Sequence, residues 1–280
     1  MFQFRIVLVF LLMCTMFTGT AQEKVLYKEV DDVKLYISVY KAENAKKSEK
    51  RPAIVYYFGG GWNSGAISQF KHHAKYFSKR GMVCLLVDYR VRKRNNTTPF
   101  DALKDAKSAM RYIKTHADEL GVDDNKIVAS GGSAGGYLAA AMASVEKFNT
   151  EGDDLSVSTI PNALVLYNPV VDISQGGYGY DRVKEEYRYF SVLHNLKRGL
   201  PPTIFFLGTE DHLIPVEMAK YYKSIYDKFG DTCVLKLYEG QKHSFFNYKN
   251  FEYYEKTVNE TDLFLQSLGY LKAKPVVEIE

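Results

Sequence analysis

The sequence predicts an α/β fold with a mostly parallel sheet and helices on both faces. Two observations support this class. Short, continuous apolar runs at 52–58, 82–88 and 163–167 are typical of strands buried on both faces. Segments of helical length separate these runs, and such alternation indicates βαβ units. The 280 residues are enough for one large domain of this kind.

The remaining elements follow from local signals. Two strands with alternating apolar residues flank an Asp31-Asp32 turn, which indicates a hairpin. Capping residues, prolines and glycines mark the helix ends. On these signals we expect strands at 25–30, 34–40, 127–129, 203–207 and 233–237, and helices at about 68–79, 98–116, 137–144, 215–229 and 251–268. The tyrosine-rich, irregular stretch at about 172–200 lies between two core strands, where a cap segment is expected.

The N-terminus has the pattern of a secretory signal peptide. Arg5 precedes an apolar run at 6–17, and Gly19 and Ala21 occupy the −3 and −1 positions of a cut before Gln22. We therefore expect residues 1–21 to be removed and the hydrolase-type domain to span 22–280. The expected product is periplasmic or secreted, without a membrane anchor after cleavage.

Composition narrows the function classes. The formal charge of +4 is small and evenly spread, so a nucleic-acid partner is not expected. The chain has no C-x-x-C and no H-E-x-x-H motif, so neither a metal nor another cofactor is expected. Cys84 and Cys233 both lie in predicted buried strands, and we expect two free thiols.

A serine at a glycine-rich corner is the main functional signal. Residues 131–135 read G-G-S-A-G and lie between a predicted strand and a predicted helix, which fits the nucleophile elbow. Such a turn lifts the Ser133 hydroxyl clear of the sheet, and the Ala134 amide lies at the helix N-terminus, where an oxyanion would form. The alternative is a structural turn between a strand and a helix.

A nucleophilic serine needs a base and an orienting carboxylate. Asp211 and His243 each follow a predicted strand, in the order Ser, Asp, His. Glu210 and Asp172 are rivals for the acid. The other histidines are weaker candidates for the base: His212 adjoins Asp211, His194 lies in the expected cap, and His72, His73 and His116 are expected to be surface groups.

A second glycine-rich loop follows the strand at 52–58. The amides of Gly60 or Gly61 can join Ala134 in holding an oxyanion. Trp62, Tyr178 and Tyr180 offer aromatic faces on which a sugar can pack, and the alternative is that these aromatics pack the cap onto the body.

Taken together, these motifs resemble those of the α/β-hydrolase superfamily, esterase/lipase type, close to acetylesterases and feruloyl-esterase-like carbohydrate esterases. The motifs that carry the resemblance are F-G-G-G-W at 58–62, D-Y-R at 88–90, G-G-S-A-G-G at 131–136, N-P-V at 168–170, G-T-E-D at 208–211 and H-S-F-F at 243–246. The resemblance implies an eight-stranded α/β-hydrolase fold and a Ser133–Asp211–His243 triad. It also implies an oxyanion hole formed by the 59–61 loop and Ala134. One position departs from the pattern: related esterases usually carry histidine where this chain has Phe58, which can brace the loop only by packing.

The sequence thus favours a serine carboxylester hydrolase that removes short acyl groups, chiefly acetyl, from carbohydrate. Its partner is a small-molecule or polysaccharide ester. One alternative is a serine peptidase of the prolyl-oligopeptidase type, but Gly132 and Ala134 flank the serine where such peptidases usually have bulky residues, and no propeller domain is present. Another is a non-catalytic binding module, a class that usually lacks a triad member.

Overall fold

The computed structural model describes residues 23–280 except 44, 47 and 48, so the predicted signal peptide lies outside the described residues. Its centre is an eight-stranded sheet of order β1-β2-β4-β3-β5-β6-β7-β8. Strand β2 runs antiparallel to both of its neighbours, and the other pairs are parallel. The strands are β1 (Glu23–Val30), β2 (Val33–Tyr40), β3 (Arg51–Tyr57), β4 (Val83–Val87), β5 (Val122–Gly132), β6 (Ala163–Tyr167), β7 (Thr203–Gly208) and β8 (Cys233–Tyr238). The predicted α/β-hydrolase fold is confirmed.

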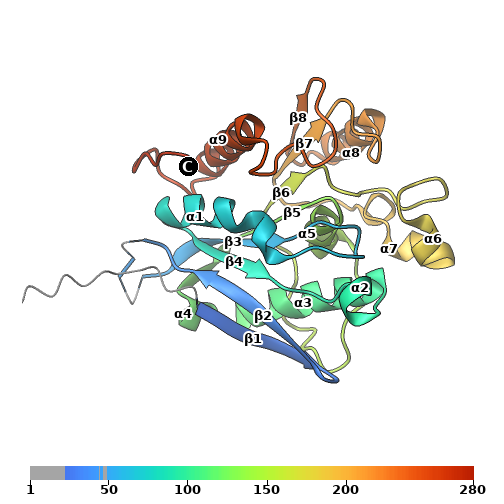
Figure 1. Ribbon diagram of the computed structural model, residues 1–280, viewed down its shortest axis with the longest axis horizontal. Coiled ribbons are helices and arrows are strands. Elements are labelled where there is room, and N and C mark those ends of the chain that lie inside the picture. The colour runs from blue at the N-terminus through green and yellow to red at the C-terminus, as the bar shows by residue number, and fades with distance from the viewer. Residues whose placement is uncertain (1–22, 44, 47–48) are drawn as a thin grey trace, which may run out of the picture.

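Helices cover both faces of the sheet (Figure 1). One face packs against α3 (Pro99–Thr115), α5 (Ala134–Ser144) and α8 (Val216–Phe229). The other packs against α1 (Lys71–Lys79) and α9 (Phe251–Ser267). The short elements are η1 (Ile67–Phe70), α2 (Arg92–Asn95), α4 (Ala117–Leu120), α6 (Tyr180–Val183), η2 (Lys184–Glu186), α7 (Tyr187–Phe190) and η3 (Leu193–Asn195). The expected cap segment therefore consists of short helical turns connected by loops.

Local chemistry explains where the long helix α3 begins. Thr98 is its N-cap, and the Thr98 hydroxyl accepts from the Asp101 amide while the Asp101 carboxylate accepts from the Thr98 amide. Pro99 at the first helical position has no amide hydrogen to leave unpaired. The predicted start of this helix is confirmed.

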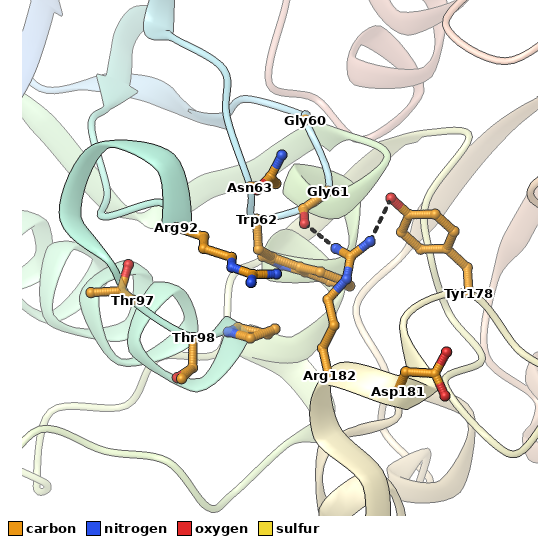
Figure 2. Close-up of a pocket in the computed structure, with 11 residues that line it drawn as sticks. Gly60, Gly61, Trp62, Asn63, Arg92, Thr97, Thr98, Tyr178, Asp181 and Arg182 are labelled. Atoms are coloured by element: carbon orange, nitrogen blue, oxygen red, sulfur yellow. Dashed lines mark hydrogen bonds between the residues drawn. The ribbon is translucent and has the colours of Figure 1, made fainter.

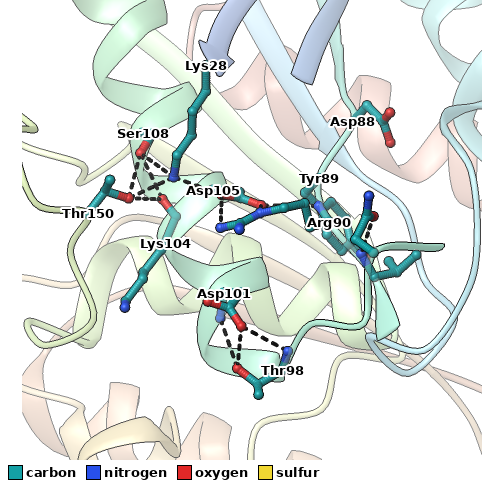
Figure 3. Close-up of polar contacts among 12 residues, drawn as sticks. Lys28, Asp88, Tyr89, Arg90, Thr98, Asp101, Lys104, Asp105, Ser108 and Thr150 are labelled. Carbon is teal, nitrogen blue, oxygen red and sulfur yellow. Dashed lines mark hydrogen bonds and ion pairs between the residues drawn. The ribbon is translucent and has the colours of Figure 1, made fainter. Parts of the chain in front are cut away.

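A buried ionic network ties β1 and the chain after β4 to α3 (Figure 3). Asp105, fully buried, accepts from the Lys28 ammonium at 2.7 Å and from two nitrogens of the Arg90 guanidinium at 2.8 and 2.9 Å. It also accepts from the Arg90 amide at 3.1 Å, and Lys28 donates further to Ser108 and Thr150. The network fixes the chain directly after β4, and this part of the chain supports the site described below.

One boundary needs correction, and one expectation is confirmed. The strand expected at 127–129 is longer: β5 begins at Val122, because Val122 pairs with Arg51 of β3. Between β4 and α3, the short helix α2 has Asn96 as its C-cap, in the left-handed conformation (φ 53°). Cys84 and Cys233 are free and buried, as expected.

Candidate active site

Ser133 lies at the sharp corner between β5 and α5. Its backbone has φ 54° and ψ −118°, a strained conformation for a residue with a side chain. The corner admits almost no neighbouring side chains: a Cβ built on Gly132 would lie 2.4 Å from the Phe246 ring, and one on Gly135 would lie 2.0 Å from the Tyr57 carbonyl oxygen. The glycines of the motif are thus required by close packing, and the hydroxyl stands at the carboxyl edge of the sheet.

The structure brings Ser133, His243 and Asp211 into one hydrogen-bonded series. Ser133 Oγ lies 2.8 Å from His243 Nε2, and His243 Nδ1 lies 2.7 Å from Asp211 Oδ2. Because the buried carboxylate only accepts, Nδ1 carries the proton and Nε2 is free to accept from the serine hydroxyl. The amides of Leu213 and Ile214 donate to the other Asp211 oxygen at 2.9 and 3.0 Å, which fixes the carboxylate.

The rival acids lie elsewhere. The Asp172 carboxylate accepts from the amide and hydroxyl of Ser174, so it closes its own turn. Glu210 is exposed at the surface. Of the other histidines, His194 and His212 are exposed, and His116 stacks on Tyr112, one turn earlier in the same helix.

His73 was expected at the surface, and this expectation is wrong. The side chain is fully buried against the aromatic side chains of Tyr56, Phe70, Tyr167, Phe246 and Tyr254. Among the described residues neither of its ring nitrogens finds a hydrogen-bond partner. Burial, aided by neighbouring His72, lowers the pKa of His73 to about 3, so the imidazole is neutral in the folded protein.

Asn168 is a residue near the site whose position the sequence did not reveal. It follows β6 with φ 35° and is fully buried. Its Oδ1 accepts from the Ser244 amide at 3.0 Å, and its Nδ2 lies 3.4 Å from His243 Nε2. Asn168 thus holds the loop that carries the histidine. The sequence signals for Asn168 were its place directly after a predicted core strand and its position in the N-P-V motif at 168–170.

The residues 59–62, here called the oxyanion loop, lie directly above Ser133. A Cβ built on Gly59 would be 3.4 Å from the Ser133 Cβ. Gly60 and Gly61 have φ of 125° and 63°, conformations that favour glycine. Within the described part of the chain, no protein acceptor pairs with the amides of Gly60, Gly61 or Ala134. The Ala134 amide is also the first of α5, where no helical carbonyl is available to it.

Four side chains brace this loop. The Phe58 ring stacks on Tyr89 with centroids 4.1 Å apart, and the Tyr89 hydroxyl donates to the Phe58 carbonyl at 2.5 Å. Gln69 accepts from the Gly59 amide at 2.6 Å. Arg182, from the expected cap, donates to the Gly61 carbonyl (Figure 2). Packing of Phe58 and these hydrogen bonds therefore hold the loop.

The aromatic residues proposed for substrate binding occupy different environments. Trp62 is only 1% exposed and packs edgewise on Tyr137 and Phe190, so it cannot offer a ring face to a sugar. That expectation needs correction: Trp62 packs the expected cap onto the body. Tyr178 is half-buried and lines a hollow beside the oxyanion loop, whereas Tyr180 is half-buried against Tyr187.

Two features are absent from the described residues. Residues 23–280, apart from 44, 47 and 48, contain no cluster of three or more His, Cys, Asp or Glu side chains arranged to hold a metal ion. The helices of the same residues are too short or too polar to span a bilayer.

An eight-stranded, mostly parallel sheet with a serine at the elbow and a histidine and aspartate after later strands defines an α/β-hydrolase of the esterase/lipase type. The model of the BD-FAE family matches residues 37–176, and the chain belongs to that family. Several relatives and solved structures that match the chain carry the names of carboxylic ester hydrolases.

The solved structure of Thermogutta terrifontis esterase 2 phosphoramylated by tabun is 42% identical, with a TM-score of 0.87, over 90% of this chain and 97% of that one. A probable isoprenylcysteine alpha-carbonyl methylesterase from Arabidopsis thaliana is 27% identical over 77% of this chain and 46% of its own length. An acetylxylan esterase from Xylanibacter ruminicola is 23% identical over 77% of this chain and 45% of its own length. The chain thus spans about half the length of these curated relatives.

Proposed function

We propose that the chain is a serine carboxylester hydrolase that works through an acyl-enzyme, with Ser133 as nucleophile. The observation that carries the proposal is the hydrogen-bonded series Ser133–His243–Asp211 beside the unpaired amides of the oxyanion loop. A hydroxyl, a base and an oriented carboxylate are the parts that acyl transfer requires.

In the proposed cycle, His243 Nε2 takes the proton of Ser133 as Oγ attacks the ester carbonyl carbon. The carbonyl oxygen becomes an oxyanion, which accepts hydrogen bonds from the amides of Ala134 and of Gly60 or Gly61. The tetrahedral intermediate then collapses, the bond to the alcohol oxygen breaks, and the imidazolium gives its proton to the leaving alkoxide. Water repeats the sequence on the acyl-enzyme and releases the acid, while Asp211 stays ionised and stabilises the imidazolium.

Replacing the nucleophile tests this proposal. Ser133→Ala should lower kcat for 4-nitrophenyl acetate by about 10⁴- to 10⁶-fold, as with other triads. Ser130→Ala is the matched control, because Ser130 is buried within β5, just before the corner that carries Ser133, and its replacement should leave kcat nearly unchanged. Near-native turnover by folded Ser133→Ala protein would rule the mechanism out.

For the substrate, we propose short acyl groups, chiefly acetyl, carried by carbohydrate. Support comes from the acetylxylan esterase among the relatives and from solved structures of the Thermogutta terrifontis esterase with propionate and butyrate bound. A series of 4-nitrophenyl esters from acetate to decanoate should give the highest kcat/KM at acetate to butyrate. A maximum at octanoate or longer would contradict the short-acyl proposal. The rate of acetate release from acetylated xylan should exceed the rate of fatty-acid release from long-chain glycerides.

A further inference from the structure

Beside the oxyanion loop lies a hollow of about 500 Å³ that the proposed chemistry does not use. Gly60 and Gly61 form one wall, and Trp62 lies beneath it. Arg92 of α2 and Arg182 of α6 reach into it from two sides, with their guanidinium groups facing the same space (Figure 2). We call this space the arginine hollow.

The arginine hollow carries positive charge that the protein does not neutralise. Within the described part of the chain, no hydrogen bond or ion pair engages the Arg92 guanidinium, and Arg182 donates only to uncharged oxygens, those of Gly61 and Tyr178. The arginines that do form ion pairs with carboxylates are Arg51, Arg80, Arg90, Arg94 and Arg111. Asp181 also borders the hollow, but its carboxylate points away from both guanidinium groups (Figure 2). The hollow therefore suits an anion.

The position of the hollow links it to the proposed reaction. A Cβ built on Gly59 would lie 3.4 Å from the Ser133 Cβ, and the next two residues, Gly60 and Gly61, line the hollow. At 3.8 Å between successive Cα atoms, its near wall is roughly 10 Å from the nucleophile. A substrate that is larger than its acyl group can reach both places at once.

We propose that the arginine hollow binds a carboxylate on the alcohol part of the substrate, so that the preferred esters are those of carbohydrates containing uronic acid. This proposal rests on the proposed function, whose substrate class it narrows. Guanidinium groups match the planar geometry of a carboxylate through paired N–H donors, and a neutral sugar gains less from them. Tyr178 supplies an aromatic edge beside the charged groups.

The test compares two acetylated uronic-acid oligosaccharides, one with free carboxylates and one with the carboxylates converted to amides. Wild-type kcat/KM should favour the free acid by about threefold to tenfold, the range for a charge-assisted contact open to water. Arg92→Gln should abolish this preference. Lys93→Gln removes a neighbouring exposed charge that does not line the hollow, and it should preserve the preference. Arg182 is a poorer choice, because it also holds the Gly61 carbonyl.

Equal kcat/KM for acid and amide, or a preference unchanged by Arg92→Gln, would overturn the proposal. Recognition of a carboxylate on the acyl part, instead of the alcohol part, is tested by comparing kcat/KM for 4-nitrophenyl hemisuccinate and 4-nitrophenyl butyrate. An Arg92-dependent preference confined to the hemisuccinate would also overturn it.

Failure of the proposed function is recognised separately. Wild-type protein and Lys93→Gln should hydrolyse 4-nitrophenyl acetate at equal rates, because that ester carries no carboxylate and Lys93 does not line the hollow. If no ester is hydrolysed, calorimetry can still measure binding of the two deacetylated oligosaccharides. Tighter binding of the oligosaccharide with free carboxylates, weakened by Arg92→Gln, supports a carboxylate site in the arginine hollow. Equal binding of the free-acid and amide forms refutes that site.

Discussion

Asp105→Asn should be among the most destabilising single substitutions at a polar position of this chain. The asparagine would leave Lys28 and Arg90 without the negative charge that compensates them, and their side chains are only 8% and 11% exposed. Breaking a buried ion pair by removing one partner costs about 3 to 5 kcal/mol. Because the Asp105 carboxylate makes contact with both cations, we expect a loss in the free energy of unfolding within that range.

Urea unfolding followed by circular dichroism measures this loss as a fall in the midpoint at constant m value. The matched control is Asp88→Asn, which removes the partner of Arg94 from an ion pair whose side chains are 28% and 43% exposed. Surface pairs of this kind contribute about 0 to 1 kcal/mol. A loss for Asp105→Asn that is no larger than that of the control would refute the reasoning from burial.

Two further predictions concern buried aromatic surroundings. Because burial lowers the pKa of His73 to about 3, the unfolded chain binds more protons than the folded one between about pH 6.5 and pH 3, and stability falls as the pH drops through this window by up to about 1.4 kcal/mol per unit. His73→Leu should therefore show a flatter dependence of unfolding free energy on pH from 6.5 to 4, and a slope equal to that of the wild type would contradict this. Tyr89→Phe removes the donor to the Phe58 carbonyl and should lower kcat about threefold to tenfold with KM little changed, because the oxyanion loop loses a brace. Tyr226→Phe, which loses hydrogen bonds to Thr203 and Tyr222 at the opposite, amino end of β7, should leave kcat unchanged, and an equal fall in both variants would count against the bracing role.

Much of the fold was predictable because its signals are local. The core strands are continuous apolar runs, and the glycines around Ser133 reflect steric demands that hold wherever such a corner forms. The order Ser, Asp, His along the chain also indicated that the acid and the base follow later strands, which selected Asp211 and His243. The structure brings both into one hydrogen-bonded series with Ser133. Each of these inferences needed only a short segment and the rule that parallel strands end at one edge.

What the sequence did not reveal depends on packing between distant segments. His73 is buried because α9 and the chain after β8 cover α1, and no pattern within 68–79 indicates this. Trp62 is buried because Phe190, more than a hundred residues later, packs on it. The hydrogen bond from Arg182 to the Gly61 carbonyl likewise joins two segments that are far apart in the sequence, so no local sequence pattern predicts it.

The central claim, that Ser133 is a nucleophile activated by His243, is tested most directly by covalent labelling with a fluorophosphonate. Peptide mass spectrometry should find one adduct, on Ser133, in the wild-type protein. His243→Ala should label far more slowly, since the base is missing, and Ser133→Ala should not label at all. An intact, folded wild-type protein that remains unlabelled, or that carries its adduct on another residue, would contradict the account.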